Sequence, residues 1–344
     1  MTVPLALRSP PRNSFFSRQR QAAALVSLDA IRQAAARIHH IAHRTPALDV
    51  SEQAGRPLLL KCEHHQPGGA FKIRGASNML LRLAPDQLAR GVITYSSGNH
   101  GQAVALAAQR LGAHAVVVMP TTAPAVKVEG VKRAQAEAIM EGTTSAHRRA
   151  RAEAEADARG LTMVPPFDHE WIIEGQGTCG LEILDQVPDA DIVVVPVGGG
   201  GLISGVAAAI RQSRPAVRVI GVEPAGAPKM SASLSAGRPV TLDNTASIAD
   251  GLMPVRPGDR TFEHVRAFVE AVLTVDDAAI ARAALWLFYQ AKQVVEPSGA
   301  ASVAAVLFPE PGSPLEDRSK RVVAVLSGGN VTPAALAALD RPGI

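Results

Sequence analysis

The sequence has few aromatic residues, only two cysteines and no long apolar run. Aromatic residues make up 3% of the 344 residues while 47% are hydrophobic, so the core must be mainly aliphatic. Cys62 and Cys179 have no CxxC or metal-type neighbour, so we expect two buried, reduced thiols and no bound metal. No apolar run is long enough to span a membrane, which predicts a soluble, cytoplasmic protein without a membrane partner.

Acidic residues are absent before Asp29, and residues 1–26 carry four arginines. An organellar transit peptide has this composition, but Pro10 and Pro11 break any long amphipathic helix, so we expect a disordered extension instead. The formal net charge of +4 is spread along the chain without interleaved aromatic residues. Nucleic acid is therefore not an expected partner.

Short apolar strands alternate with helices along the chain, after a first helix that begins near Ser27. The clearest strands lie at residues 57–63, 91–97, 113–120, 191–197, 217–223 and 321–327. Continuously apolar strands of this length are typical of buried parallel sheets. The sequence thus predicts an α/β protein whose site lies at the C-terminal ends of the strands.

Lys72 follows a turn that contains Gly68 and Gly69, and it opens a run with apolar residues at helical spacing. The positive end of a helix dipole repels an ammonium group, so this position, with partial burial, lowers the pKa of a lysine. A neutral amine is what Schiff-base formation with an aldehyde cofactor requires. The alternative is a solvated surface lysine.

Two loops that follow strands favour anions. The loop 96–101 (SSGNHG) precedes a helix and offers backbone N–H groups to a carboxylate, although it could be only a turn with a helix cap. Gly198, Gly199, Gly200 and Gly201 follow the strand at 191–197. Four successive glycines are entropically costly in a loop that merely connects, so they indicate a closely approaching phosphate.

The second of these loops also permits a different cofactor. Gly199, Gly201 and Ser204, with Glu223 after the next strand, outline a dinucleotide-binding unit that lacks its third glycine. A nicotinamide-dependent dehydrogenase is therefore an alternative from another class. No Walker lysine pattern is present, which excludes nucleotide hydrolysis.

Ser327 ends the last strand and precedes Gly328, Gly329 and Asn330. By default it is an ordinary turn residue. Beside the ring nitrogen of pyridoxal phosphate, however, a serine would not hold that nitrogen protonated as an aspartate would. A neutral ring is a weaker electron sink, which favours β-elimination or racemisation over transamination.

Together these motifs resemble the fold-type II pyridoxal-phosphate enzymes, specifically the serine/threonine dehydratase and serine racemase family. The resemblance runs from about Ser27 to Pro333 and rests on GGAFKIRGA, SSGNHGQA, GQGT, VPVGGGGLISG, IADG, EPSGA and LSGGN. It implies a tryptophan synthase β-like fold, with two parallel-sheet lobes and the cofactor between them. We expect residues 27–75 and 160–344 to form the large domain and residues 76–159 the small one.

The resemblance also implies site roles. Lys72 would form the Schiff base and carry the α-proton, and Ser97 matches the acid/base that serine racemases place on the opposite face. The other cofactor-binding residues would be Phe71 at the ring, Asn99 at its phenolic oxygen, Gly198, Gly199, Gly200 and Gly201 at the phosphate, and Ser327 at the ring nitrogen. The substrate carboxylate would be bound by Ser96, Ser97, Gly98, Asn99 and His100.

Some positions depart from the family pattern. Ala70 stands where many relatives have serine. Glu223 matches the first ligand of a divalent-metal site in racemase-like members, but Lys229 stands at an acidic ligand position. Our hypothesis is that the Lys229 ammonium replaces the metal by pairing with Glu223. His64 and His65 are expected to be solvated loop histidines.

The sequence thus predicts a homodimeric pyridoxal-phosphate lyase that converts a small L-β-hydroxy amino acid, such as threonine or serine, to a 2-oxo acid and ammonia. An amino-acid racemase that uses Lys72 and Ser97 is the alternative within the family. A protein that binds an amino acid without turnover is a further one. Since the sequence ends shortly after LSGGN, we expect no regulatory domain and no feedback control by isoleucine.

Overall fold

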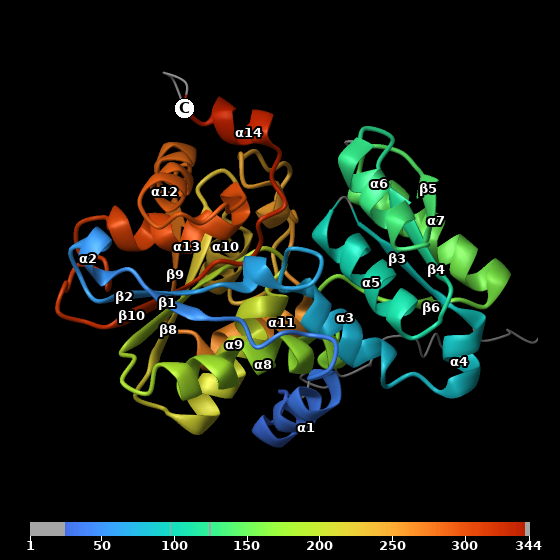
Figure 1. Ribbon diagram of the computed structural model, residues 1–344, viewed down its shortest axis with the longest axis horizontal. Helices are drawn as coiled ribbons and strands as arrows, with labels where there is room; N and C mark the ends of the chain where they lie inside the picture. Colours follow the sequence, from blue (N-terminus) through green and yellow to red (C-terminus); the bar gives the residue numbers. More distant parts are fainter. Residues whose placement is uncertain (1–24, 97, 124, 341–344) are drawn as a thin grey trace, which may run out of the picture.

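The protein is built on two β-sheets, each covered by helices on both faces (Figure 1). The computed structural model describes residues 25–96, 98–123 and 125–340, so nearly all of the expected extension lies outside the described residues. Val26 is buried, and its amide donates to Nε2 of His264 at 2.9 Å. The chain is therefore anchored to the fold from Val26 onward.

In each sheet the strands lie side by side in a fixed order. The larger sheet contains β1 (Ala47–Asp49), β2 (Leu58–Lys61), β10 (Val322–Val325), β7 (Ile192–Pro196), β8 (Arg218–Pro224) and β9 (Ala271–Val275). The smaller sheet contains β5 (Glu137–Met140), β4 (Ala115–Met119), β3 (Val92–Tyr95) and β6 (Thr162–Met163). Only the β1–β2 pair is antiparallel among these strands. The predicted α/β class with two parallel-rich sheets is confirmed.

Helices connect and cover these strands. In the first half of the chain they are α1 (Leu28–Ile38), α2 (Ser51–Ala54), α3 (Lys72–Leu80), α4 (Pro85–Arg90), α5 (Asn99–Arg110), α6 (Ala125–Arg133) and α7 (Ser145–Arg159). The second half contains α8 (Glu170–Gln186), α9 (Gly201–Ser213), α10 (Lys229–Ala236), α11 (Asp259–Phe268), α12 (Asp277–Tyr289), α13 (Pro297–Leu307) and α14 (Pro333–Ala338). Two 3-10 turns are η1 (Glu63–His65) and η2 (Asp250–Leu252).

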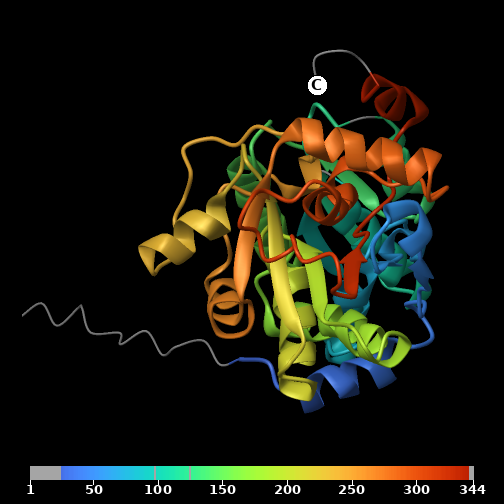
Figure 2. The same ribbon diagram turned by 90° about the vertical axis from the view of Figure 1, so that its left-hand side faces the viewer.

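Alternate side chains of the larger sheet enter two different apolar layers. Leu58 and Leu60 pack on one face with α12 and α13, whereas Leu59 and Val193 pack on the other with α8, α9 and α11. Figure 2 shows the orange helix α12 above this sheet and the yellow-green helix α8 below it. Burial of both faces explains why the central strands β7 and β10 are apolar at every position.

The smaller sheet is covered in the same way. Val92 and Val117 pack with α5, while Ile93 and Val116 pack on the opposite face, where α7 contributes Ala152. This sheet takes its strands from residues 92–163, and the larger sheet takes its strands from residues 47–61 and 192–325. The domain boundaries at residues 75 and 160 stay a prediction. Among the described residues, no helix combines the length and apolar character needed to cross a bilayer.

Candidate active site

Lys72 is the first residue of α3, as the sequence predicted. Its Nζ donates to the carbonyl oxygen of Pro166 at 2.7 Å and lies 5.1 Å from the centre of the Phe71 ring. Burial lowers the pKa of Lys72 from 10.5 to about 8. At neutral pH this raises the neutral fraction of the amine by roughly two orders of magnitude over an ordinary lysine, because each pKa unit is a factor of ten.

The loop after β10 lies directly against the residues that precede Lys72. The amide of Phe71 donates to the carbonyl of Ser327 at 3.1 Å, and the amide of Gly329 donates to the carbonyl of Gly69 at 2.9 Å. Ser327 is buried, and its hydroxyl lies 3.5 Å from the carbonyl oxygen of Ser298. The structure therefore brings together the two segments that carry Lys72 and Ser327.

The four glycines lie between β7 and the first turn of α9. Gly200 has φ of +96°, and a Cβ on Gly199 would lie 2.3 Å from the Phe167 ring, so both positions require glycine for reasons within the protein. The first N–H groups of α9 have no acceptor within the helix and suit an anion. Protein packing is thus a second cause of these glycines, and their role at a phosphate stays a prediction.

Asn99 and His100, which belong to the loop predicted to bind a carboxylate, are the first two residues of helix α5. The Asn99 amide donates to Oε1 of Glu296 at 2.7 Å and accepts from Nδ2 of Asn330 at 2.9 Å. Asn99 therefore links α5 to the residue that precedes α13 and to the loop after β10.

The His100 ring makes its polar contact within the protein. It is buried, its Nε2 lies 3.1 Å from the carbonyl of Val164, and burial lowers its pKa to about 3. A neutral ring held in this way brings no positive charge to a substrate. Ser97 lies outside the described residues, whereas the Ser96 hydroxyl accepts from the amide of Gly98 at 3.1 Å. A carboxylate would thus depend on backbone N–H groups and small hydroxyls here.

Glu296 is an acidic group that the sequence placed in a motif without giving it a role. Its side chain is buried next to Asn99, and a Cβ on Gly328 would lie 2.5 Å from its Oε1. Burial, with a contribution from Asp250, raises the pKa of Glu296 from 4.5 to about 7. The available signal was an acid just before a proline that starts a helix.

Replacing Glu296 by glutamine should remove a pH-dependent cost of folding. The raised pKa means that wild type has no penalty below pH 4.5, loses stability as the pH rises and reaches the full penalty above about 7. Glutamine carries no charge and can still accept from Asn99. Urea unfolding should show Glu296→Gln gaining on the order of 2 kcal/mol over wild type between pH 5 and pH 8. A difference that stays constant with pH would contradict this.

The GQGT motif (175–178) belongs to helix packing and not to the cofactor site. A Cβ on Gly175 would lie 2.6 Å from the carbonyl oxygen of Arg74, so this glycine lets α8 approach α3. Thr178 accepts from the buried guanidinium of Arg74, which also pairs with Glu63 at 2.6 Å and with Glu182 at 2.7 Å. This buried ionic network fixes the first turn of the helix that Lys72 opens.

Lys229 and Glu223 form a fully buried ion pair, as the sequence hypothesis required. Nζ of Lys229 lies 3.0 Å from the Glu223 carboxylate, and both side chains have no exposed surface. The ammonium also donates to the carbonyls of Val197, Ala227 and Leu252 at 2.8, 3.1 and 2.9 Å. One carboxylate and three carbonyl oxygens around a positive charge are the ligands that a hard cation would choose.

The same burial argues against the dinucleotide alternative. Oε1 of Glu223 accepts from the amide of Met230 at 2.8 Å, and Oε2 accepts from the amide and hydroxyl of Ser231, both at 2.9 Å. A ribose hydroxyl would need this carboxylate at the surface. Glu223 is therefore unavailable for that role.

The prediction that His64 and His65 are both exposed holds for only one of them. His65 is exposed, as predicted, but His64 is buried with 9% exposure, because the turn η1 directs its ring towards Gln293. The expectation of a solvated loop side chain is wrong for His64. Both cysteines are buried and free, as predicted.

Comparison with known proteins identifies the family. Residues 40–328 match the family described as "Pyridoxal-phosphate dependent enzyme". The chain is 42% identical over 310 residues to an L-threonine ammonia-lyase of Thermotoga maritima, covering 89% of this chain and 76% of that protein. It is also 42% identical over 308 residues to a serine racemase of Oryza sativa subsp. indica, covering 88% and 91%.

The solved structures that match this chain likewise include racemases and a threonine deaminase. Maize serine racemase matches with a TM-score of 0.87 at 42% identity, covering 92% of this chain and 97% of that one. The processed form of threonine deaminase isoform 2 from Solanum lycopersicum matches with a TM-score of 0.85 at 35% identity, covering 92% and 94%. A pyridoxal 5'-phosphate-dependent aspartate racemase matches with a TM-score of 0.83 at 34% identity, covering 90% and 98%.

Proposed function

Because this chain belongs to the family of pyridoxal-phosphate dependent enzymes, we propose that it is an ammonia-lyase that converts a small L-β-hydroxy amino acid, such as threonine or serine, to a 2-oxo acid and ammonia. Its cofactor is pyridoxal phosphate. When bound, this cofactor supplies an electron sink for the electron pair left at the substrate α-carbon.

The residues present fit this cofactor. Lys72 supplies an amine whose pKa of about 8 leaves part of it neutral, and the glycine loop supplies N–H groups at the start of α9. Ser327 lies against the Lys72 segment and offers a hydroxyl, not a carboxylate, to a ring nitrogen. We assign Lys72 to the aldehyde carbon, Phe71 to the ring face, Asn99 to the phenolic oxygen and residues 198–201 to the phosphate.

Each residue then has a task in the lyase reaction. The loop 96–100 holds the substrate carboxylate, which leaves the α-hydrogen facing the amine of Lys72. With its amine free, Lys72 would accept that proton. The β-hydroxyl would leave as water with one proton, which balances the one removed from the α-carbon, and hydrolysis of the released enamine would give the 2-oxo acid and ammonia.

The observation that carries the proposal is the position of Ser327 beside the segment of Lys72. The test is release of 2-oxo acid and ammonia from L- and D-serine, L- and D-threonine and 3-hydroxyaspartate by the purified, cofactor-loaded enzyme. Release from an L-β-hydroxy amino acid would support the lyase and identify its substrate. Release from none of them, with an unchanged spectrum of the bound cofactor, would refute it.

A racemase is the second candidate, because serine racemases and ammonia-lyases are related to this chain at the same 42% identity. Racemisation needs an acid/base on the face opposite Lys72, and by resemblance that group is Ser97. Replacing Ser97 by alanine should lower D-serine formation from L-serine at least about tenfold, since one general acid is lost. Chiral chromatography measures this directly.

The effect on the lyase reaction separates the two candidates. Elimination from the L-isomer uses Lys72 alone for the α-proton, so the Ser97→Ala variant should lose much less 2-oxo acid release than racemisation. Equal loss of both activities would contradict the assignment of Ser97 to the second face and would point to a role in carboxylate binding.

The assembly belongs to the same proposal. We expect the two sheets to form a large lobe (27–75 and 160–344) and a small lobe (76–159), with the cofactor between them, in a cytoplasmic homodimer. The pair Lys127–Asp250, at 2.8 Å, would then bridge the lobes beside the substrate loop. Light scattering of the purified enzyme should give a mass twice that of the chain, and a monomer would contradict the assembly.

A further inference from the structure

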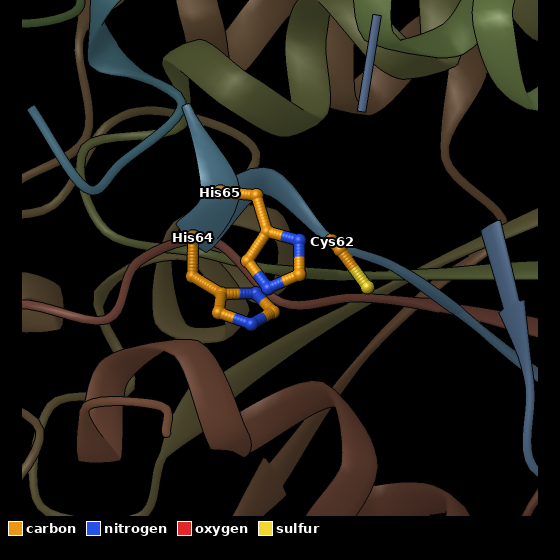
Figure 3. A group of neighbouring side chains, drawn as sticks. All are labelled: Cys62, His64 and His65. Atoms are coloured by element: carbon orange, nitrogen blue, oxygen red, sulfur yellow. The ribbon is translucent and has the colours of Figure 1, made fainter. Parts of the chain in front are cut away.

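Cys62, His64 and His65 lie together in and beside the turn η1, directly after strand β2 (Figure 3). One ligand atom from each of the three lies within 4.8 Å of the others. The two imidazole rings are neighbours, with centroids 4.1 Å apart and planes inclined by 52°. The cluster therefore holds one sulfur and two nitrogens close together, outside the residues assigned to the cofactor.

His64 is prepared as a ligand by its contact with Gln293. Nε2 of His64 lies 3.0 Å from Oε1 of Gln293, and since that oxygen can only accept, Nε2 carries the proton. Nδ1 then has a free lone pair. This atom is buried and has no hydrogen-bond partner in the part of the chain that the structure describes. A buried acceptor without a donor needs an explanation. In metal-binding histidines, the ring nitrogen that does not bind the metal typically donates its proton to a fixed acceptor, as Nε2 of His64 does here to Gln293.

We propose that Cys62, His64 and His65 bind one Zn²⁺ ion, with water as the fourth ligand. A thiolate and two imidazoles suit this borderline metal, whereas Mg²⁺ and Ca²⁺ need oxygen ligands that the cluster lacks. The exposed ring of His65 gives the ion a path from solvent.

Binding would change the state of Cys62. It is now a buried, free thiol whose sulfur lies 3.3 Å from the carbonyl oxygen of Leu60. Zinc would therefore displace the thiol proton to solvent as the Zn–S bond forms. Small side-chain rotations must close the distances, because zinc ligands lie about 2.0–2.3 Å from the metal.

The position of the cluster connects it to the loop after β10. A Cβ on Gly329 would lie 3.1 Å from Cβ of His64, so the His64 side chain packs against this loop. An ion held by His64 would therefore lie close to this loop.

The experiment titrates the cofactor-loaded enzyme with Zn²⁺ by calorimetry and with Co²⁺ by absorption spectroscopy. We expect one ion per chain and a thiolate-to-cobalt charge-transfer band. Replacing His65 by alanine should weaken Zn²⁺ binding at least about tenfold, since one of three protein ligands is lost. His40→Ala is the matched control, because His39 and His40 form a second adjacent, exposed pair, with centroids 5.3 Å apart.

A second pair of variants tests the sulfur ligand. Cys62→Ser should abolish the charge-transfer band. Cys179→Ser should retain it, because Cys179 lies in the apolar layer on the opposite face of the larger sheet. Equal affinity of wild type and His65→Ala for Zn²⁺, or a cobalt spectrum without a sulfur band, would overturn the proposal. Neither readout depends on the reaction that the enzyme catalyses.

Discussion

A Lys72→Ala variant is expected to release 2-oxo acid at least about a thousandfold more slowly than wild type, because one group both holds the cofactor and moves the α-proton. The geometry supports this double role. Lys72 begins a helix, contacts one carbonyl oxygen and has a pKa of about 8 as a result of burial. Alanine retains the helix but has neither the nucleophile nor the base. Single-turnover and steady-state assays with the preferred substrate would measure the loss.

The control for Lys72 is a helical lysine in a different environment. Lys132 is exposed on α6, and Lys132→Ala should retain activity. Cofactor content, measured by absorption, separates lost chemistry from lost binding, since the glycine loop remains in Lys72→Ala. Added small primary amines should restore part of the activity by replacing the missing amine. Undiminished turnover in Lys72→Ala would disprove the assignment of Lys72 as the catalytic amine and would favour a reaction that does not need this lysine.

The sequence could predict the larger sheet's inner strands and the loops after them, because each relies on local pattern. The predicted strand at 191–197 is apolar from Ile192 onward and is followed by four glycines. It corresponds to β7, which is followed by the start of α9. In contrast, β9 and α11 were not predicted. β9 lies at the edge of the sheet and is only partly buried, so its sequence AVLTV carries a weaker pattern.

What the sequence could not supply were roles that depend on distant partners. The glycines of GQGT are explained by the close approach of α8 to α3, which no local pattern shows. Glu296 and Asn99 meet only when α13 and α5 are both in place. His64 is buried because Gln293, far along the chain, receives its ring. The motifs of the site could be found from residue spacing. Their buried hydrogen bonds and pKa shifts could be described only once the fold was known.

Replacing Lys229 by methionine is expected to lower the free energy of unfolding by about 3–5 kcal/mol, the usual cost of breaking a buried ion pair. The change leaves the Glu223 carboxylate buried without its counter-charge, although Met230 and Ser231 still donate to it. It also leaves three carbonyl oxygens without their shared donor. Urea unfolding of the variant and wild type at one pH would measure the difference.

Two controls isolate the ion pair from the loss of a side chain. Lys132→Met removes an exposed lysine and should change stability by less than about 0.5 kcal/mol. The double variant Lys229→Met with Glu223→Gln should be more stable than Lys229→Met alone, because no charge is then left unpaired. If Lys229→Met unfolds like wild type, the buried pair does not stabilise the fold.

Lys229→Ala tests whether the ammonium stands in for a metal ion. This variant leaves a space bordered by the Glu223 carboxylate and the carbonyls of Val197, Ala227 and Leu252, which is an oxygen-lined cation site. Added K⁺ or Mg²⁺ should therefore raise the unfolding temperature of Lys229→Ala while leaving wild type unchanged. Since Val197 directly precedes the glycine loop, the same ions should restore cofactor affinity in the variant. A wild-type enzyme whose turnover rises with Mg²⁺ would show that Lys229 does not replace the metal.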